Sequence, residues 1–194
     1  MRSKSNSTQT TKDLEEAFWR LYRDKPLNKI TIGQICETAG YNRGTFYLHF
    51  QDIYGVLESI EHELLCDMAD CVEECMKHLK RDTSKLSLLS ACKDVVLYYE
   101  RNKGRIAVLL SENGDPSFTF RLKERLKPLW REYIIPPNPT RSNDEIELVL
   151  EYTLSGVLFM ISKWLSNKGS VTTWQMAHLI YDCSIKDVES RFES

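Results

Sequence analysis

The segment GYNRGTFYLHF, residues 40–50, gathers side chains whose chemistry suits contact with a nucleic acid. The guanidinium of Arg43 can pair with a guanine edge, and the side chain of Leu48 suits a thymine methyl group. The hydroxyls of Thr45 and Tyr47 suit phosphate oxygens. The same residues also fit an ordinary turn with aromatic packing, and spacing alone leaves both interpretations open.

A second group has the chemistry of metal ligands. Cys71, Cys75 and His78 are spaced i, i+4, i+7, so they share one helix face and could bind a metal with one further ligand. That face also carries Leu64, and a buried cysteine behaves as a small apolar residue, which favours core packing. We therefore predict no metal site. Cys66 is the best candidate for an exposed, oxidisable thiol.

No pattern typical of catalysis is found in the sequence. There is no phosphate-binding loop, no H-E-x-x-H motif and no nucleophile elbow. The six cysteines form no C-x-x-C pair, and disulfides are rare in cytosolic proteins. We predict that the protein is not an enzyme and holds no cofactor. The alternative hypothesis is a helical enzyme, which a tightly bound metal or cofactor in the purified protein would support.

Composition and charge narrow the class further. The 194 residues, 42% hydrophobic and 28% charged, are typical of a globular protein of one or two domains. The longest apolar runs have five residues, far short of the roughly 20 that a membrane span needs, and the N-terminus is polar. We therefore expect a cytoplasmic protein with no membrane segment. Basic residues are in excess over 1–55, whereas residues 56–79 carry one Lys against seven acids, which suggests an anionic partner at the N-terminal end.

The elements that must position residues 40–50 are helices. Apolar residues recur with the helical period, and no alternating strand pattern is present, so the sequence predicts an all-α fold. Pro26 ends the first helix, and Gly40 lies where a left-handed cap would end a second helix over 32–39. A third helix is expected from Asn42 to near Phe50. Further helices are expected at 52–79, 85–102, 104–112, 115–134, 143–168 and 172–190. Capping patterns support three of these starts, at Asp115 with Pro116, Ser142 with Glu145, and Thr172 with Gln175.

Two short helices joined by a glycine-containing turn match the helix-turn-helix plan. In that plan the second helix enters the major groove of DNA, and its N-terminal residues face the base edges. Phe46 and Phe50, four residues apart, would hold the third helix on its own core. The side chains left to face outward are those of Arg43, Thr45, Tyr47, Leu48 and His49.

The stretch ITIGQICETAGYNRGTFYLHFQD closely resembles the DNA-binding segment of TetR-family transcriptional regulators. The residues in the family's spacing are Thr31, Ile32, Ile35, Ala39, Gly40, Gly44, Thr45, Tyr47, His49 and Phe50. The resemblance implies an N-terminal three-helix DNA-binding domain over 1–55, with its motif at about 31–50. A helical domain for effector binding and dimerisation would follow over 56–194.

The resemblance also implies roles for individual residues. Thr31, Tyr47 and His49 would touch phosphates, while those nearest the bases would be Asn42, Arg43, Gly44, Thr45 and Leu48. Two positions depart from the family pattern. Cys36 replaces an alanine, and Ile53 stands where the family usually has a lysine that reaches a phosphate. The loss of that contact would weaken DNA binding without changing its mode.

For the second domain the resemblance implies a small-molecule pocket and a homodimer. The aromatic candidates for the pocket are Tyr98, Tyr99, Phe118, Phe120 and Trp130, each of which also fits simple core packing. Apolar residues on the last two helices are the expected dimer interface, namely Val157, Ile161, Leu165, Leu179 and Ile180. The implied function is a repressor released from a palindromic double-stranded DNA operator by a small-molecule effector. The alternative is a dimeric protein-binding module on the same fold with weak or lost DNA binding.

Overall fold

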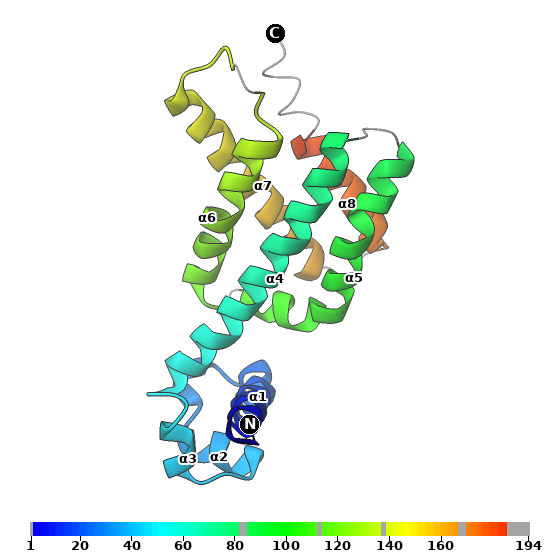
Figure 1. Cartoon of the computed structure of the whole chain (residues 1–194). Coiled ribbons are helices and arrows are strands. Elements are labelled where there is room, and N and C mark those ends of the chain that lie inside the picture. The colour runs from blue at the N-terminus through cyan, green and yellow to red at the C-terminus, as the bar shows by residue number, and fades with distance from the viewer. Residues whose placement is uncertain (1, 82–84, 112–113, 137–138, 167–169, 186–194) are drawn as a thin grey trace. The chain divides into compact units, whose positions relative to one another are not determined.

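The structure, a computed structural model, describes residues 2–81, 85–111, 114–136, 139–166 and 170–185. Within these ranges the chain is helical and contains no strand, as the periodicity predicted (Figure 1). The helices are α1 (Arg2–Asp24), α2 (Ile32–Ala39), α3 (Arg43–Tyr47), α4 (Ile53–Arg81), α5 (Lys85–Leu109), α6 (Pro116–Tyr133), α7 (Asn143–Ser166) and α8 (Thr173–Ile180). A 3-10 turn, Leu27–Lys29, lies between α1 and α2, and a π-helical turn, Tyr181–Ile185, follows α8.

Several predicted helix ends are confirmed by their caps. Gly40 adopts a left-handed φ of 75° after α2, a conformation that favours glycine because a Cβ atom would be strained there. Asp115 caps α6 with Pro116 in the first turn. The Ser142–Glu145 and Thr172–Gln175 pairs form the hydrogen bonds expected of capping boxes at the starts of α7 and α8.

Other ends differ from the prediction. The predicted break at residue 103 is wrong, because α5 runs without interruption from Lys85 to Leu109. A glycine inside a helix costs only about 1 kcal/mol relative to alanine, so the burial of Val96, Ile106 and Leu109 outweighs Gly104. Helix α3 ends at Tyr47 rather than near Phe50, whereas α8 continues directly into the π-helical turn that ends at Ile185. Residues 186–190 of the last predicted helix lie outside the described residues.

The chain divides into two compact units, Met1–Leu64 and Leu65–Ser194. The sequence placed the boundary between residues 55 and 56, whereas the division by packing falls inside α4. The first turns of α4 belong to the N-terminal unit, where Val56, Leu57 and Ile60 are buried. Ser59 of α4 donates a hydrogen bond of 2.7 Å to Glu15 of α1 within this unit.

The core of the N-terminal unit joins α1, α2, α3 and the start of α4. Its fully buried side chains are Leu14, Phe18, Ile35, Phe46 and Val56. Phe46 and Phe50 lie with their ring centroids 5.9 Å apart, so the pair that was predicted to anchor α3 does so.

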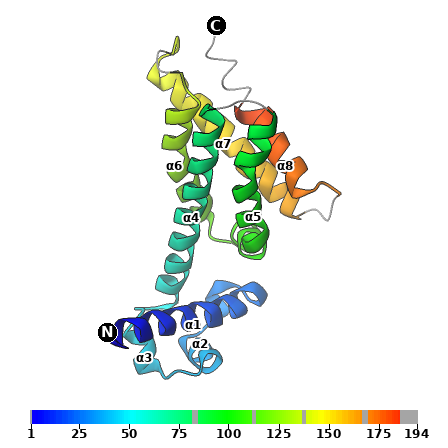
Figure 2. The same cartoon turned by 45° about the vertical axis from the view of Figure 1, so that its right-hand side comes forward.

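The second unit packs α5, α6, α7, α8 and the rest of α4 around a separate core. Figures 1 and 2 both show α5 beside α8 and α6 beside α7, in agreement with their contacts. Fully buried side chains from α5, α6 and α7 meet there, among them Ile106, Phe118, Leu122, Leu150 and Leu154. Ion pairs link Lys123 and Lys127 of α6 to Glu151 of α7 along the outer edge of that contact.

Candidate nucleic-acid interface and ligand cavity

The turn between α2 and α3 is built by local hydrogen bonds. Thr31 begins α2, and its Oγ1 accepts from the backbone N–H of Gln34 at 3.3 Å, while the Gln34 side chain accepts from the Thr31 N–H at 3.1 Å. Thr31 is exposed, and no acidic side chain lies in the first turn of α2. The positive end of the helix dipole is therefore open to an anion such as a DNA phosphate.

The start of α3 is also held by its own residues. Asn42 Oδ1 accepts from the Thr45 backbone N–H at 2.8 Å and from the Thr45 hydroxyl at 3.3 Å. A Cβ atom on Gly44 would lie 3.1 Å from Asn42 Oδ1, so the glycine leaves room for this cap. Asn42, Gly44 and Thr45 thus have a structural role in addition to the base contacts predicted for them.

The outward face of α3 carries exposed side chains of unusual character. Tyr47 is 58% exposed and Leu48 is 83% exposed, while the neighbouring Phe46 is completely buried. The exposed Arg43 side chain reaches Gly33 in the first turn of α2, where its Nη2 would be 3.2 Å from a Cβ atom on that glycine. Tyr47 and Leu48 are exposed next to Arg43, and an exposed apolar surface of this kind is typical of a binding site.

His49 is positioned by α1, which the sequence did not predict. Its Nδ1 lies 2.9 Å from Thr11 Oγ1, so a phosphate contact by His49 would have to use Nε2. Tyr41 donates a hydrogen bond of 2.8 Å to Asp13 of α1. Hydrogen bonds from Gln9 and Tyr41 hold the pKa of Asp13 below its ordinary value, so this carboxylate is charged at neutral pH. No short-range pattern reveals these supports, because α1 lies about 30 residues earlier.

The start of α4 directly follows the α2–turn–α3 segment in the sequence. Asp52 accepts from the Gly55 N–H at 2.9 Å and caps the helix. Ile53, which departs from the family pattern, is half-buried, whereas Tyr54 is exposed. Tyr54 is a further candidate for a phosphate contact that sequence reasoning missed.

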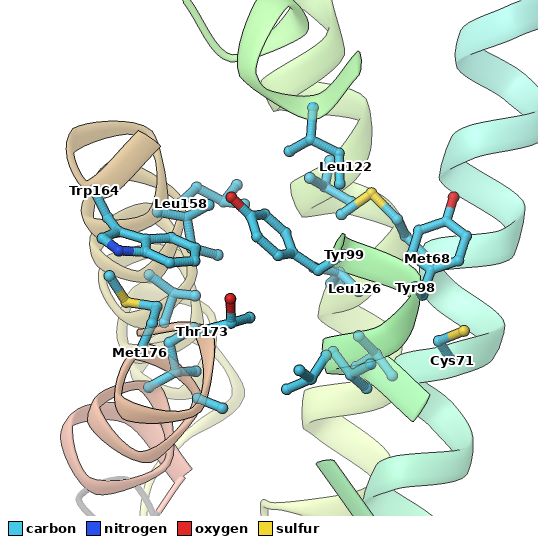
Figure 3. Close-up of a pocket in the computed structure, with 18 of the residues that line it drawn as sticks. Met68, Cys71, Tyr98, Tyr99, Leu122, Leu126, Leu158, Trp164, Thr173 and Met176 are labelled. Atoms are coloured by element: carbon cyan, nitrogen blue, oxygen red, sulfur yellow. The ribbon is translucent and has the colours of Figure 1, made fainter. Parts of the chain in front are cut away.

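The second unit contains a cavity of about 160 Å³. Its walls come from α4, α5, α6, α7 and α8, and none of the twenty described residues that line it is charged. Figure 3 shows Tyr99 directed toward Trp164, and these rings lie 5.0 Å apart between centroids. On the right of Figure 3, Tyr98 lies near Met68 and Cys71 of α4, away from Trp164 on the left.

Only three of the five aromatic residues predicted for the pocket line the cavity. Tyr98, Tyr99 and Trp130 line the cavity. Phe118 is completely buried outside its lining, and Phe120 is exposed on the outer side of α6. Both residues lie on α6 together with Trp130, but they are on other faces of this helix and therefore do not reach the cavity.

The residues predicted for the dimer interface do not form one exposed surface. Val157, Ile161 and Ile180 line the cavity, so they face the interior of their own unit. Leu165 is half-buried and Leu179 is partly exposed. The apolar side chains that α7 leaves in solvent are on its opposite face, namely Leu148, Tyr152 and Phe159, which are 71%, 72% and 73% exposed.

Helix α7 is long and apolar enough to cross a membrane, with a mean hydropathy of 1.4 over an 18-residue window. Length and composition alone are weak support for a span. One face of α7 is buried with Ile146, Leu150 and Leu154 in the second unit. The high hydropathy arises because the opposite face is apolar as well.

The cysteines provide no metal site in the part of the chain that the structure describes, where no three potential ligands converge. Cys71 and Cys75 are half-buried and His78 is exposed, so the predicted core packing is only partial. Cys66 is half-buried with its Sγ 3.9 Å from Arg125 Nη2, and the more exposed thiol is that of Cys183.

Comparison with known proteins agrees with this architecture. The model described as bacterial regulatory proteins of the tetR family matches residues 16–60, and a transcriptional regulator C-terminal region matches residues 87–186. No curated protein matches the chain in sequence. The crystal structure of a TetR transcriptional regulator from Streptococcus agalactiae 2603V is similar in fold, with a TM-score of 0.64 and 20% identity over 93% of this chain and 98% of that one. The dihydroxyacetone kinase operon activator DhaS has a TM-score of 0.61 and 15% identity, over 95% of this chain and 96% of that one.

One matched region lies in each unit, and the first contains the whole α2–turn–α3 segment. The surface of exposed Arg43, Tyr47 and Leu48 is therefore carried by a helix-turn-helix, and the family has no enzymatic activity. The chain belongs to the TetR family of DNA-binding transcriptional regulators.

Proposed function

We propose that this protein is a homodimeric repressor in the cytoplasm that binds a palindromic operator and leaves it when a small molecule occupies the cavity. The observation that carries the proposal is the pairing of an exposed recognition surface on α3 with an apolar, uncharged cavity in the other unit. A cavity of this kind is the usual form of a small-molecule site.

Helix α4 provides the covalent connection between the two activities. It runs unbroken from Ile53 to Arg81, and it contributes Met68, Cys71 and Val72 to the cavity wall. A dimer can bind a palindrome only when its two α3 helices are about one DNA turn apart. An effector that binds more tightly to a conformation with another spacing shifts the population away from DNA.

We place the dimer interface on the exposed face of α7 formed by Leu148, Tyr152 and Phe159. These residues follow one another at helical spacing. Ser155, which lies between Tyr152 and Phe159 on this face, has a small side chain that leaves room for a partner helix. Phe120 of α6 and Phe159 border the same shallow groove, which widens the apolar surface. Two copies of such a face related by a two-fold axis would match the symmetry of a palindrome.

The first test selects DNA fragments with the purified protein and measures binding to the enriched sequence by fluorescence anisotropy. A palindromic consensus with strongly salt-dependent affinity is expected. Transcription in vitro from a promoter that carries this site should fall when the protein is added. Binding without sequence preference would instead support the protein-binding module. Increased transcription would overturn the repressor role, and this outcome is tested because the similar protein DhaS is named as an activator.

Arg43→Ala should reduce affinity for the selected operator by about 1–3 kcal/mol per half-site and relax the preference at one base position. The reason is that Arg43 is the exposed guanidinium at the start of α3. Tyr47→Phe is the matched variant, because it removes one hydroxyl and should weaken binding to all sequences alike. Selection repeated with both variants checks this. An unchanged consensus and affinity for Arg43→Ala would show that Arg43 does not read bases.

Ile53→Lys should strengthen DNA binding at low salt, because it supplies the phosphate contact that the family pattern has at this position. The slope of log affinity against log salt should steepen by about 0.9 for each subunit bound. Val171→Lys adds the same charge at an exposed position of the other unit and should leave the slope unchanged. Equal slopes for wild type and Ile53→Lys would mean that the first turn of α4 does not reach the backbone.

A further inference from the structure

The cavity of the second unit has a wall that is almost entirely apolar. Of the twenty described lining residues, none carries a carboxylate, ammonium or guanidinium group, and fourteen are aliphatic residues or methionines. Burial raises the pKa of Tyr99 to about 12 and also raises the pKa of the Cys71 thiol. Both groups are therefore uncharged at neutral pH, and the wall offers no charge to a ligand.

The lining residues that do have polar side-chain atoms expose very little of them to the cavity. The Trp164 Nε1–H donates to the Val171 carbonyl at 2.9 Å, and the Thr173 hydroxyl donates to Glu100. The Nε1 atom of Trp130 is enclosed by the protein, so this indole meets the cavity with its carbon atoms. A ligand in the cavity therefore touches carbon and sulfur atoms almost everywhere.

Such a wall selects against polar ligands. A hydroxyl, amide or charged group that leaves water for this cavity loses its hydration and gains no hydrogen bond in return. Apolar surface, by contrast, is stabilised in proportion to the area that is removed from water. Each polar group on a ligand should therefore weaken its binding, whereas each apolar group that fits should strengthen it.

The volume of the cavity limits the size of the ligand. It is about 160 Å³, and an engineered apolar cavity of about 150 Å³ holds benzene. The rings of Tyr99 and Trp164, whose centroids are 5.0 Å apart, form part of the wall (Figure 3). Aromatic rings pack favourably against the faces and edges of such side chains, which favours a ring in the ligand.

We propose that the effector of this cavity is an uncharged, apolar molecule about the size of one substituted benzene ring, which is held by apolar contact alone, without a hydrogen bond or an ion pair. This inference rests on the proposed role of the cavity as the effector site and adds the chemical class of the effector. Recognition then depends on how well the ligand fills the cavity and on the absence of polar groups.

Three single-ring probes test the chemical class by isothermal titration calorimetry on the full chain. Toluene and phenol are nearly equal in size and differ by a methyl group against a hydroxyl, and benzoate adds a negative charge. Toluene should bind at least about tenfold more tightly than phenol, and at least about 100-fold more tightly than benzoate, because the polar groups find no partner. Binding of phenol or benzoate as tight as that of toluene would overturn the ligand class.

Biphenyl tests the size limit separately. It is more apolar than toluene, so it would bind more tightly if apolar surface alone decided the affinity. Because its second ring exceeds the volume of the cavity, it should instead bind at least about tenfold more weakly than toluene, in line with the usual cost of overpacking. Biphenyl binding as tight as that of toluene would overturn the size limit.

Variants at Ala177 locate the binding. Ala177→Phe places a ring at the cavity wall and should abolish toluene binding, and the smaller change Ala177→Leu should weaken it. Ala107→Phe makes the same substitution on α5 outside the lining and should leave toluene binding intact. Circular dichroism checks that each variant is folded. Toluene binding that is unchanged in folded Ala177→Leu and Ala177→Phe would show that the ligand lies elsewhere.

Release from DNA is measured separately, by adding toluene to the operator complex and following fluorescence anisotropy. Release by toluene, with none by benzoate at the same concentration, is expected. Binding in the cavity with no release would leave the ligand class standing and would contradict effector control. Failure of every probe to bind, with operator binding unchanged, would contradict the ligand class and leave the DNA-binding role standing.

Discussion

Replacing Phe159 with Glu should convert the protein into a folded monomer and abolish operator binding. Phe159 is 73% exposed on the face of α7 that does not pack into its own unit. In a two-fold dimer each substitution occurs twice, and a charge buried at the interface without a partner costs several kcal/mol. A monomer presents only one α3 helix, so it cannot bind the two half-sites together. Sedimentation velocity and anisotropy on the selected operator measure the two effects.

Two variants make this experiment specific. Leu97→Glu changes a partly exposed leucine on α5 in the same way and should leave the dimer intact. Val157→Glu lies on the buried face of α7 and should unfold the second unit instead of producing a folded monomer. If Phe159→Glu remains dimeric at micromolar concentration, the interface lies on another surface of the chain.

Replacing Phe46 with Ala should destabilise the N-terminal unit by about 3–5 kcal/mol, the usual cost of removing a buried phenylalanine. Phe46 has no exposed surface and packs against Phe50 and the edge of Tyr47. Because small domains are stable by only about 5–15 kcal/mol, this loss should lower the melting temperature of the unit sharply and remove DNA binding. Thermal unfolding followed by circular dichroism checks the first part.

The neighbouring residue provides the control. Tyr47→Ala removes an aromatic ring that is 58% exposed, so it should leave the melting temperature nearly unchanged and still weaken DNA binding. Of these two adjacent residues in one short helix, only Phe46 would then affect stability strongly, while both would affect DNA binding. Equal melting temperatures for wild type and Phe46→Ala would show that α3 is not anchored by this ring.

The helix-turn-helix was predictable because its determinants are local. The Thr31 and Asn42 caps and the left-handed Gly40 depend on partners within four residues. The helical period also indicates correctly that Phe46 turns inward while Tyr47 and Leu48 face solvent. The approach of Arg43 to Gly33 and the support of His49 by Thr11 were not predictable, since both depend on packing between separate helices.

The sequence by itself determined the all-α class, most helix starts and the family of the DNA-binding segment. Only the tertiary structure decided which apolar face of α7 is internal. The sequence favoured the strip that contains Val157 and Ile161 as the interface, yet that strip faces the cavity, and the exposed strip contains Tyr152 and Phe159. Periodicity identifies an apolar face, but a helix that is apolar on two sides carries no local sign of which side its own chain will cover. That choice depends on contacts with α4, α5 and α6, which are distant in sequence and form only when the whole unit packs.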